Sequence, residues 1–403
     1  MSGVPSIPSS QAGQRLISAR AFWLKFAVCI GFMAGLVLSH KLWISSRSYP
    51  LTPVLSFLKP VGPWFDEALF VTLLVLLALI VVVANPAKLI GGFVSVAVVC
   101  ALFDQSRWQP WVYQYLFLLT AIGFFLANQA HSEKRDAALH TCRLIIASTY
   151  VWSGIQKINP GFVQHTFPWM IEPFIQSLPA AVKLWLHPLG FVMPFVELGT
   201  GIGLLTRKFR NFSVLVALAM HLVILASIGP WGHNYNNVVW PWNIAMGAFV
   251  ILLFAQEKEA SPKDVLWNGK FAFQMLVLIL FGILPAFSLF NLWDGYLSSA
   301  LYPGTRNAAT IYMTGAVAAK LPGDVQEFVT EDAPNEDELA VAAWSWGEMN
   351  VPPYPEIRIF KSIGKRVCRD AVNPSDVKLV VQGKTTFFEP GRQLVFDCDS
   401  LAK

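Results

Sequence analysis

Long apolar stretches dominate the first 300 residues, and short polar segments separate them. A helix that crosses a bilayer needs about 20 mostly apolar residues. Because backbone polar groups cannot stay unpaired in lipid, each such stretch is predicted to be a membrane-spanning helix. We expect nine of these spans, at residues 22–39, 68–84, 89–103, 111–127, 142–158, 189–205, 212–228, 238–255 and 271–290. The span at 89–103 is short, and without it the count is eight.

The last hundred residues have a different pattern. Alternating apolar positions predict three strands, the first two joined as a hairpin, at residues 376–382, 385–389 and 393–397. The apolar spacing within 356–367 predicts an amphipathic helix. The proline-rich stretch 351–355 is predicted to be a rigid connector, and the acidic stretch 330–338 a solvated loop. This tail either caps the helices or contacts a substrate.

Composition supports the division. Hydrophobic residues make up 55% of the 403 positions and charged residues 14%, whereas soluble domains are about 25% charged. Residues 301–403 hold 14 of the 25 Asp and Glu residues. The expected fold class is an all-α polytopic membrane protein with a small α+β extracytoplasmic domain. The expected division is a disordered cytoplasmic N-terminus at 1–20, a membrane domain at 21–295 and a soluble domain at 296–403.

Lys and Arg in short loops favour the cytoplasmic side of a membrane. Every second loop along the chain is basic, most clearly the loops 206–210 and 256–270. The basic loop 40–66 is the exception to this alternation. We therefore expect a multi-pass protein of the inner membrane with a cytoplasmic N-terminus. Nine spans place the C-terminus in the periplasm, and eight place it in the cytoplasm. The first span resembles a signal peptide but is expected to be retained, because no small-x-small site follows Leu38.

The cysteines divide in the same way as the apolar pattern. Cys29, Cys100 and Cys142 lie in predicted spans, where a single cysteine behaves as a small hydrophobic residue. Cys368 and Cys398 are the only pair in the tail and form a disulfide if the tail faces an oxidising compartment. No CxxC, CxxH or HExxH motif occurs, so no metal site is predicted. The basic residues flank the membrane and give no support to nucleic-acid binding.

Three of the ionisable residues in the predicted spans are candidates for function. An ionisable side chain in lipid is costly and is therefore a candidate for function, which gives Lys157, Glu197 and His221 as catalytic candidates. Each also has a structural interpretation. Lys157 can extend its ammonium to the lipid headgroups, Glu197 can fix helix packing, and His221 can be a satisfied interior histidine.

Aromatic and amide side chains crowd the loop 229–237, which contains His233 and Asn234. Interfacial aromatic residues form an ordinary membrane belt, but the added histidine and asparagines also suit a lid over a ligand site. Trp108, beside Asp104 and Arg107, is expected near the same opening.

The segment 152–159, with the sequence WSGIQKIN, resembles a helix end of the HTTM family, the membrane domain shared with vitamin K-dependent gamma-carboxylases. Lys157 falls on the position of that family's base lysine. The segments 103–113 and 346–368 are also similar to members of the family. Glu197 and residues 220–222 occur in the same order along the chain as the corresponding positions of the family. Pro110-Trp111 stands where the carboxylases carry an Asn-His pair.

The resemblance implies a lipophilic quinone or quinol and a base lysine that desolvation makes easier to deprotonate. Six residues are the cofactor-binding candidates: Trp108, Trp111, Trp152, Asn159, His233 and Asn234. Lys157 is expected to face a cavity between helices.

Three functions remain open. The first is a quinol-linked enzyme that acts on an extracytoplasmic substrate, with Lys157 as base. The second is a DoxX-like membrane subunit that binds quinone or transfers electrons. The third is a non-catalytic scaffold or maturation partner. The expected partners are membrane lipid and either a protein substrate or the other subunits of a membrane complex.

Overall fold

The structure is a computed structural model. It describes residues 9–55, 57–59, 61–257, 260–267, 271–333, 336–386 and 388–402. Part of the predicted basic loop 256–270 and residue 387 of the predicted second strand lie outside the described residues.

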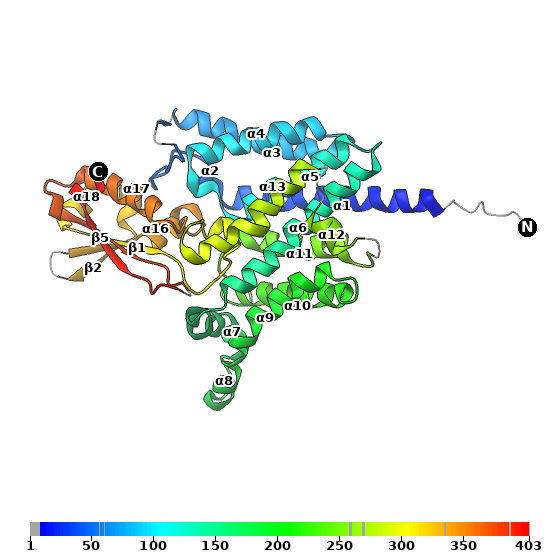
Figure 1. The fold of residues 1–403 in the computed structure, drawn as a ribbon. Helices are drawn as coiled ribbons and strands as arrows, with labels where there is room; N and C mark the ends of the chain where they lie inside the picture. The colour runs from blue at the N-terminus through cyan, green and yellow to red at the C-terminus, as the bar shows by residue number, and fades with distance from the viewer. Residues whose placement is uncertain are drawn as a thin grey trace, which may run out of the picture.

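Helices make up most of the fold (Figure 1). In the first 300 residues they are α1 Ser9–Leu38, α2 His40–Trp43, α3 Pro63–Val82, α4 Ala87–Phe103, η1 Gln105–Arg107, α5 Pro110–Ala127, α6 Ser132–Gln156, η2 Phe162–Thr166, α7 Phe167–Ile175, α8 Ala180–Leu186, α9 Leu189–Leu205, α10 Arg210–Ile228, α11 Val239–Phe254, α12 Pro262–Leu266, α13 Ala272–Val277, η3 Leu278–Ile283, η4 Leu284–Phe290 and η5 Tyr296–Ser298.

The C-terminal part combines short helices with strands. Its elements are β1 Ala308–Met313, α14 Gly315–Ala318, α15 Gly323–Gln326, β2 Val329–Ala333, β3 Glu336–Ala340, α16 Val341–Met349, α17 Ile357–Val367, η6 Cys368–Asp370, η7 Pro374–Asp376, β4 Val377–Gln382, β5 Gln393–Asp397 and α18 Cys398–Ala402.

Among the described residues, six segments are long and apolar enough to cross a membrane. They are Ala19–Leu38, Pro63–Val82, Pro110–Ala127, Ala180–Leu205, Arg210–Ile228 and Ala272–Phe290. The predicted count of nine is not confirmed. Ala87–Phe103 and Val239–Phe254 are apolar but shorter, and the charged residues at the start of α6 lower its hydropathy. The segment Ala180–Leu205 contains α8 and α9, and His187 and Pro188 between them keep a helical backbone.

The prediction that residues 1–20 are disordered is wrong for the part that the structure describes. Helix α1 begins at Ser9, and the polar residues before the first span continue the same helix. Arg20 supports this end, because its guanidinium bonds the Glu257 carboxylate at 3.1 Å and the carbonyl of Ala255 at 3.0 Å. Residues 1–8 lie outside the described residues. The start of α1 and the C-terminal sheet lie at opposite ends of the helical bundle (Figure 1).

The C-terminal sheet is antiparallel, with strand order β2-β3-β1-β4-β5. Helices α16 and α17 pack against its central strands, and the buried positions alternate along β4, as expected for a sheet with one covered face. The helix predicted at 356–367 and the strands at 376–382 and 393–397 are confirmed as α17, β4 and β5.

Two predictions in the tail are wrong. The acidic stretch 330–338 is not a solvated loop, because residues 329–333 and 336–340 form β2 and β3, which pair along the edge of the sheet. The described residues of 385–389 form no strand. Residues 383–392 are instead the loop between β4 and β5, so β4 pairs with β5 and not with 385–389. Alternation alone cannot distinguish a strand from a loop that packs its aromatic side chains.

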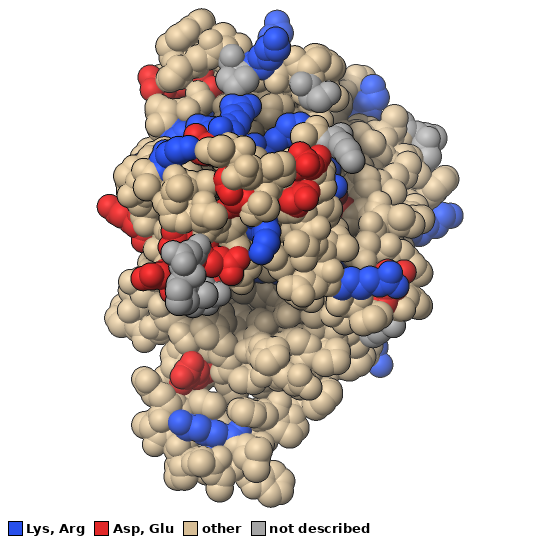
Figure 2. All heavy atoms as spheres, turned by 90° about the vertical axis from the view of Figure 1, so that its left-hand side faces the viewer, with Lys and Arg blue, Asp and Glu red and all other residues tan. Residues whose placement is uncertain are grey.

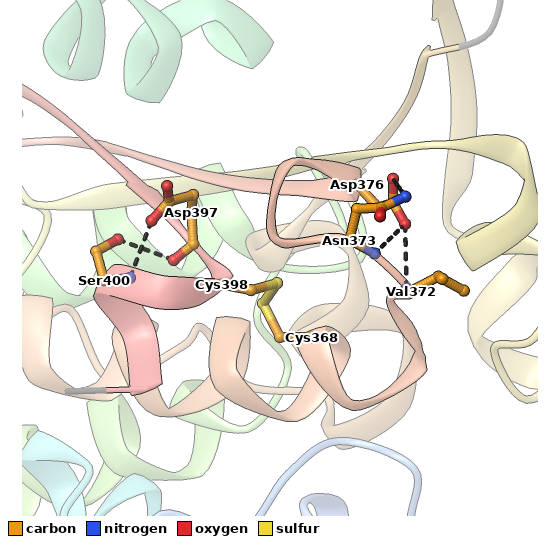
Figure 3. Close-up of a disulfide and its surroundings, with 7 residues drawn as sticks. All are labelled: Cys368, Val372, Asn373, Asp376, Asp397, Cys398 and Ser400. Carbon is orange, nitrogen blue, oxygen red and sulfur yellow. Dashed lines mark hydrogen bonds between the residues drawn. A yellow bond between two sulfur atoms is a disulfide. The ribbon is translucent and has the colours of Figure 1, made fainter.

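Cys368 and Cys398 form the predicted disulfide, with their Cα atoms 5.6 Å apart (Figure 3). The bond joins the end of α17 to the start of α18, directly after β5. Hydrogen bonds hold the backbone on both sides. The Asp376 carboxylate accepts from the amides of Val372 and Asn373, and Asp397 accepts from the Ser400 amide at 2.9 Å. The last strand is therefore fixed to α17 by a covalent bond.

Replacing both disulfide cysteines with serine should lower the free energy of unfolding of the C-terminal part by about 3 kcal/mol, because the bond closes a loop of about 30 residues. Proteolysis at increasing urea concentration measures this loss, and reduced wild-type protein should match the double variant. Rapid alkylation of both cysteines in the non-reduced protein would contradict the disulfide and favour a cytoplasmic tail.

Candidate functional site

Helices α6 and α9 approach each other closely at two glycines. A Cβ atom at Gly154 would lie 2.5 Å from the backbone nitrogen of Leu198. A Cβ atom at Gly201 would lie 2.8 Å from the carbonyl oxygen of Ala147. Any larger residue at either position would force the helices apart, and small residues are the usual solution to close packing in membranes. This approach brings the end of α6 within side-chain reach of Glu197 on α9.

Lys157 is bound to Glu197 inside the bundle. Its ammonium donates to Glu197 Oε2 and to Ser153 Oγ, each at 2.6 Å. Lys157 is 7% exposed, and its side chain turns back along α6 toward Ser153. The ammonium therefore does not extend to the headgroups, and the interpretation of Lys157 as a snorkelling residue is wrong. Asn159 ends the helix before Pro160, because its amide donates to the carbonyls of Gln156 and Pro303.

His221 is part of the same polar group. Its Nδ1 lies 2.9 Å from Asn243 Oδ1, and its Nε2 lies 2.6 Å from the hydroxyl of Tyr150. Since the Asn243 oxygen can only accept, we assign the ring proton to Nδ1, and Tyr150 then donates to Nε2. Glu197 is close enough to interact electrostatically with both Tyr150 and His221.

The structure therefore brings the three catalytic candidates together. We name this group the intramembrane cluster, comprising Tyr150, Ser153, Lys157, Glu197, His221 and Asn243. It joins helices α6, α9, α10 and α11. The ammonium of Lys157 and both ring nitrogens of His221 already have partners within the cluster. Its hydrogen bonds form two sets, one around Lys157 and one around His221, and each set can hold a proton and stabilises helix packing.

A cavity of about 430 Å³ lies between the helical bundle and the C-terminal sheet domain. We name it the interface cavity. Its wall combines the sheet-facing ends of α5 and α11, the chain that follows η4, the connector before α17 and the loop between β4 and β5. The wall residues on which the argument below depends are Trp111, Asn236, Trp242, Trp293, Glu356 and Lys384. Ligand pockets commonly have this size and mostly apolar lining with a few polar groups.

Two residues of the cavity wall have buried polar atoms without a partner among the described residues. These atoms are Asn236 Oδ1, an acceptor, and Trp293 Nε1, a donor. The amide nitrogen of Asn236 donates to the Tyr302 hydroxyl at 2.9 Å, which fixes the orientation of its oxygen. A buried polar atom without a partner is unfavourable, so both positions are suited to a ligand that supplies the missing hydrogen bonds.

The cavity also has ionisable groups that are perturbed by burial. Burial and, as a smaller contribution, the neighbouring Asp294 carboxylate raise the pKa of Glu356 to about 7. Burial lowers the pKa of Lys384, and the Glu356 carboxylate opposes this shift. Two ionisable groups in one cavity whose pKa values are shifted in opposite directions are typical of a functional site.

The predicted cofactor residues lie in different places. Trp111 lines the interface cavity, whereas the others are not part of its wall. Trp152 donates to the carbonyl of Gly282, and Trp108 packs edge-on against Tyr113. His233 stacks on Trp169 and bonds its carbonyl at 2.6 Å. Asn234 has a left-handed backbone with φ 48° in the same loop.

The loop 229–237 does reach the cavity, but through Tyr235 and Asn236 and not through His233 and Asn234. The sequence reasoning missed Glu356 and Lys384. Glu356 directly follows the proline-rich connector and Lys384 lies in the turn after β4, and neither position differs in sequence from an ordinary solvent-exposed charge. Only the packing of the sheet domain against the bundle brings them together.

The intramembrane cluster and the interface cavity are connected through α6. Gln156, next to Lys157, bonds Ser288 Oγ and accepts from Lys384 Nζ at 3.4 Å, and both partners line the cavity. Lys157 itself is not part of the wall of the interface cavity, and the expectation that it faces a cavity between helices stays a prediction.

Within the described residues, no three His, Cys, Asp or Glu side chains are grouped as a metal site. No protein-family model, curated protein or solved structure matches this chain.

Proposed function

We propose that this protein binds a lipophilic quinone or quinol in the interface cavity and acts as a quinol-linked membrane enzyme on an extracytoplasmic substrate. The observation that carries the proposal is the cavity itself, which is largely apolar and joins membrane helices to a sheet domain stabilised by a disulfide. A disulfide in this domain is consistent with an oxidising compartment at that end of the bundle.

The cavity wall fits the ring of such a cofactor. Trp111 and Trp242 supply flat apolar surfaces, Trp293 Nε1 can donate to a ring carbonyl, and Asn236 Oδ1 can accept from a ring hydroxyl. When bound, a quinol supplies two electrons and two protons to its reaction. In this proposal the isoprenoid-like tail of the compound lies along the membrane helices that border the cavity.

In this proposal Lys157 is the base, and Glu197 controls its proton. Two buried charges carry a large desolvation penalty, which a pair of neutral groups avoids. Transfer of a proton from the ammonium to the carboxylate gives such a neutral pair, so this transfer costs little free energy. Tyr150 and His221 offer a second place for that proton. Because Lys157 lies outside the cavity wall, it acts on a ligand there only after its ammonium leaves Glu197 and Ser153 and moves toward the cavity past Gln156.

Two measurements test the proposal. Mass spectrometry of lipids that copurify in mild detergent should detect a quinone. Lys157→Arg should abolish quinol oxidation while the protein still folds, because a guanidinium keeps the charge but does not release its proton. The matched control is Lys25→Arg. Lys25 is a second buried lysine in the bundle and donates only to the carbonyls of Val81 and Val83. Full activity in Lys157→Arg would rule out Lys157 as the base.

One observation favours a role within a complex, as a quinone-binding subunit or a maturation partner. Helix α8 projects away from the bundle (Figure 1), and its Leu184 and Trp185 are 70% and 82% exposed. Exposed apolar residues of this kind commonly contact lipid or another protein. Purification as a stoichiometric complex that Trp185→Ser disrupts would support this alternative.

A further inference from the structure

Lys384 is a cation in the interface cavity without a counter-ion. Its ammonium donates to Ser288 O at 3.2 Å and to Gln156 Oε1 at 3.4 Å, and both acceptors are neutral. No described carboxylate lies within ion-pair distance of it, although Glu356 is close enough to interact electrostatically. Burying a charge without a partner of opposite sign is unfavourable. Lys384 is partly buried, and an anion in the cavity would supply the opposite charge that its two neutral acceptors do not.

The position of Lys384 is fixed by its surroundings. Its backbone amide donates to Asn307 Oδ1 at 2.7 Å, and Phe388 of the same loop stacks on Phe290 at the end of η4, with 4.6 Å between ring centroids. The loop between β4 and β5 is thus held against the last helix of the bundle, and the ammonium is oriented before any ligand binds. Such preorganisation favours binding because less conformational freedom is lost.

Other charges on the wall also favour an anion. Basic residues outnumber acidic ones on the wall, because Arg306, Arg358, Lys384 and Arg392 line it against Glu356 and Glu389. Of these, Arg358 is neutralised by Asp294. Figure 2 looks onto this end of the molecule, where charged side chains gather over the sheet domain and the protrusion below has few. The apolar part of the wall, with Trp111 and Trp242, lies on the bundle side.

We propose that the interface cavity binds an organic anion, an acidic group on an apolar ring or chain, and that Lys384 is its counter-ion. The acidic group lies against Lys384 with Arg306 and Arg392 nearby, and the apolar body packs on the tryptophans. This inference rests on the proposed function only in taking the interface cavity as a ligand site. It holds for any acidic ligand and does not require a quinone.

The test compares two probes of equal shape, 2-naphthoate and the neutral 2-naphthamide. Their binding to the full chain in nanodiscs is measured by equilibrium dialysis, and binding to protein-free nanodiscs is subtracted. The wild type should bind naphthoate at least about tenfold more tightly than naphthamide, since a charge-assisted contact is worth about 1.5–3 kcal/mol. A second pair, decanoate and decanamide, distinguishes a ring from a chain as the apolar body.

Lys384→Gln should remove the preference for naphthoate and leave naphthamide binding unchanged, and Lys384→Arg should retain the preference. The matched control is Lys378→Gln on β4, whose ammonium is at the surface beside Glu336. Equal binding of the two probes to the wild type would overturn the inference, and so would a preference that survives in Lys384→Gln. Separate titration with neutral 1,4-naphthoquinone tests the proposed function, so each proposal can fail independently.

Glu356 gives the site a pH dependence. The groups that face it are Asp294, Arg358, Lys384, the Tyr354 hydroxyl and the Gly295 amide. Since its pKa is about 7, Glu356 is mostly neutral below that pH and repels an anion above it. Naphthoate affinity should therefore fall several-fold from about pH 6 to about pH 8. Glu356→Gln should abolish this fall, and an unchanged profile in that variant would exclude Glu356 as its cause.

Discussion

Replacing Lys157 with methionine should lower the free energy of unfolding by about 3–5 kcal/mol, because it leaves the Glu197 carboxylate buried without a partner. The Glu197 side chain is 13% exposed and receives its short contact from the ammonium, so little solvent is available to compensate. Glu197→Leu should cost a similar amount, since it leaves the ammonium unpaired. Unfolding in mixed micelles with increasing SDS, followed by tryptophan fluorescence, measures these changes.

The double variant Lys157→Met with Glu197→Leu should recover most of the lost stability, because two apolar residues replace the pair without leaving a charge. If the cluster serves catalysis, the double variant is stable but inactive. If the pair only fixes the packing of α6 against α9, the double variant keeps its activity. If the double variant instead loses as much stability as the two single variants together, Lys157 and Glu197 are not directly coupled.

Arg107→Met should destabilise the protein by a similar amount, about 3–5 kcal/mol. Its guanidinium is fully buried and bonds Asp66 Oδ1 at 2.6 Å together with the carbonyls of Leu42, Trp43 and Cys100. A single side chain therefore joins the ends of α2 and α4 to the start of α3. The substitution leaves one carboxylate and three carbonyl groups without this donor.

The same SDS titration measures the effect of Arg107→Met. Arg369→Met is the matched control, because Arg369 is exposed and lies in the C-terminal part, and it should change the free energy of unfolding by less than about 0.5 kcal/mol. An Arg107→Met variant as stable as the control would show that the buried network contributes nothing. Asp104, expected from the sequence near a ligand opening with Arg107, is also fully buried and pairs with Arg47 and Arg107, so both residues are neutralised within the protein.

Long apolar stretches predicted the helical membrane part, and hydrophobic periodicity predicted α17, β4 and β5, because each of these three elements buries one regular face. The cost of a charge in lipid also singled out Lys157, Glu197 and His221 as separate catalytic candidates, which the structure places close together, and their catalytic role stays a prediction. The pattern failed at β2 and β3, where acidic residues on the exposed face of an edge hairpin resemble a loop. It also failed at Glu356 and Lys384, whose burial arises only from contact between two parts of the chain.

The first span illustrates a further limit. The polar sequence before it has no apolar face, so nothing local distinguishes a disordered leader from a helix extended by its neighbour. Arg20 provides that distinction through Glu257, which is 237 residues away in sequence. Long-range ion pairs of this kind cannot be predicted from the spacing of residues along one element.

The disulfide has a consequence for when the cavity can form. Cys398 directly follows β5, and the loop that holds Lys384 is the connection between β4 and β5. While the two thiols are reduced, β5 is held by its pairing with β4 and by packing such as that of Phe396 under Lys361, and the loop that closes the cavity loses its covalent anchor. Reduction of the disulfide should therefore weaken ligand binding in the cavity, so that maturation of the binding site depends on the redox state around the C-terminal domain.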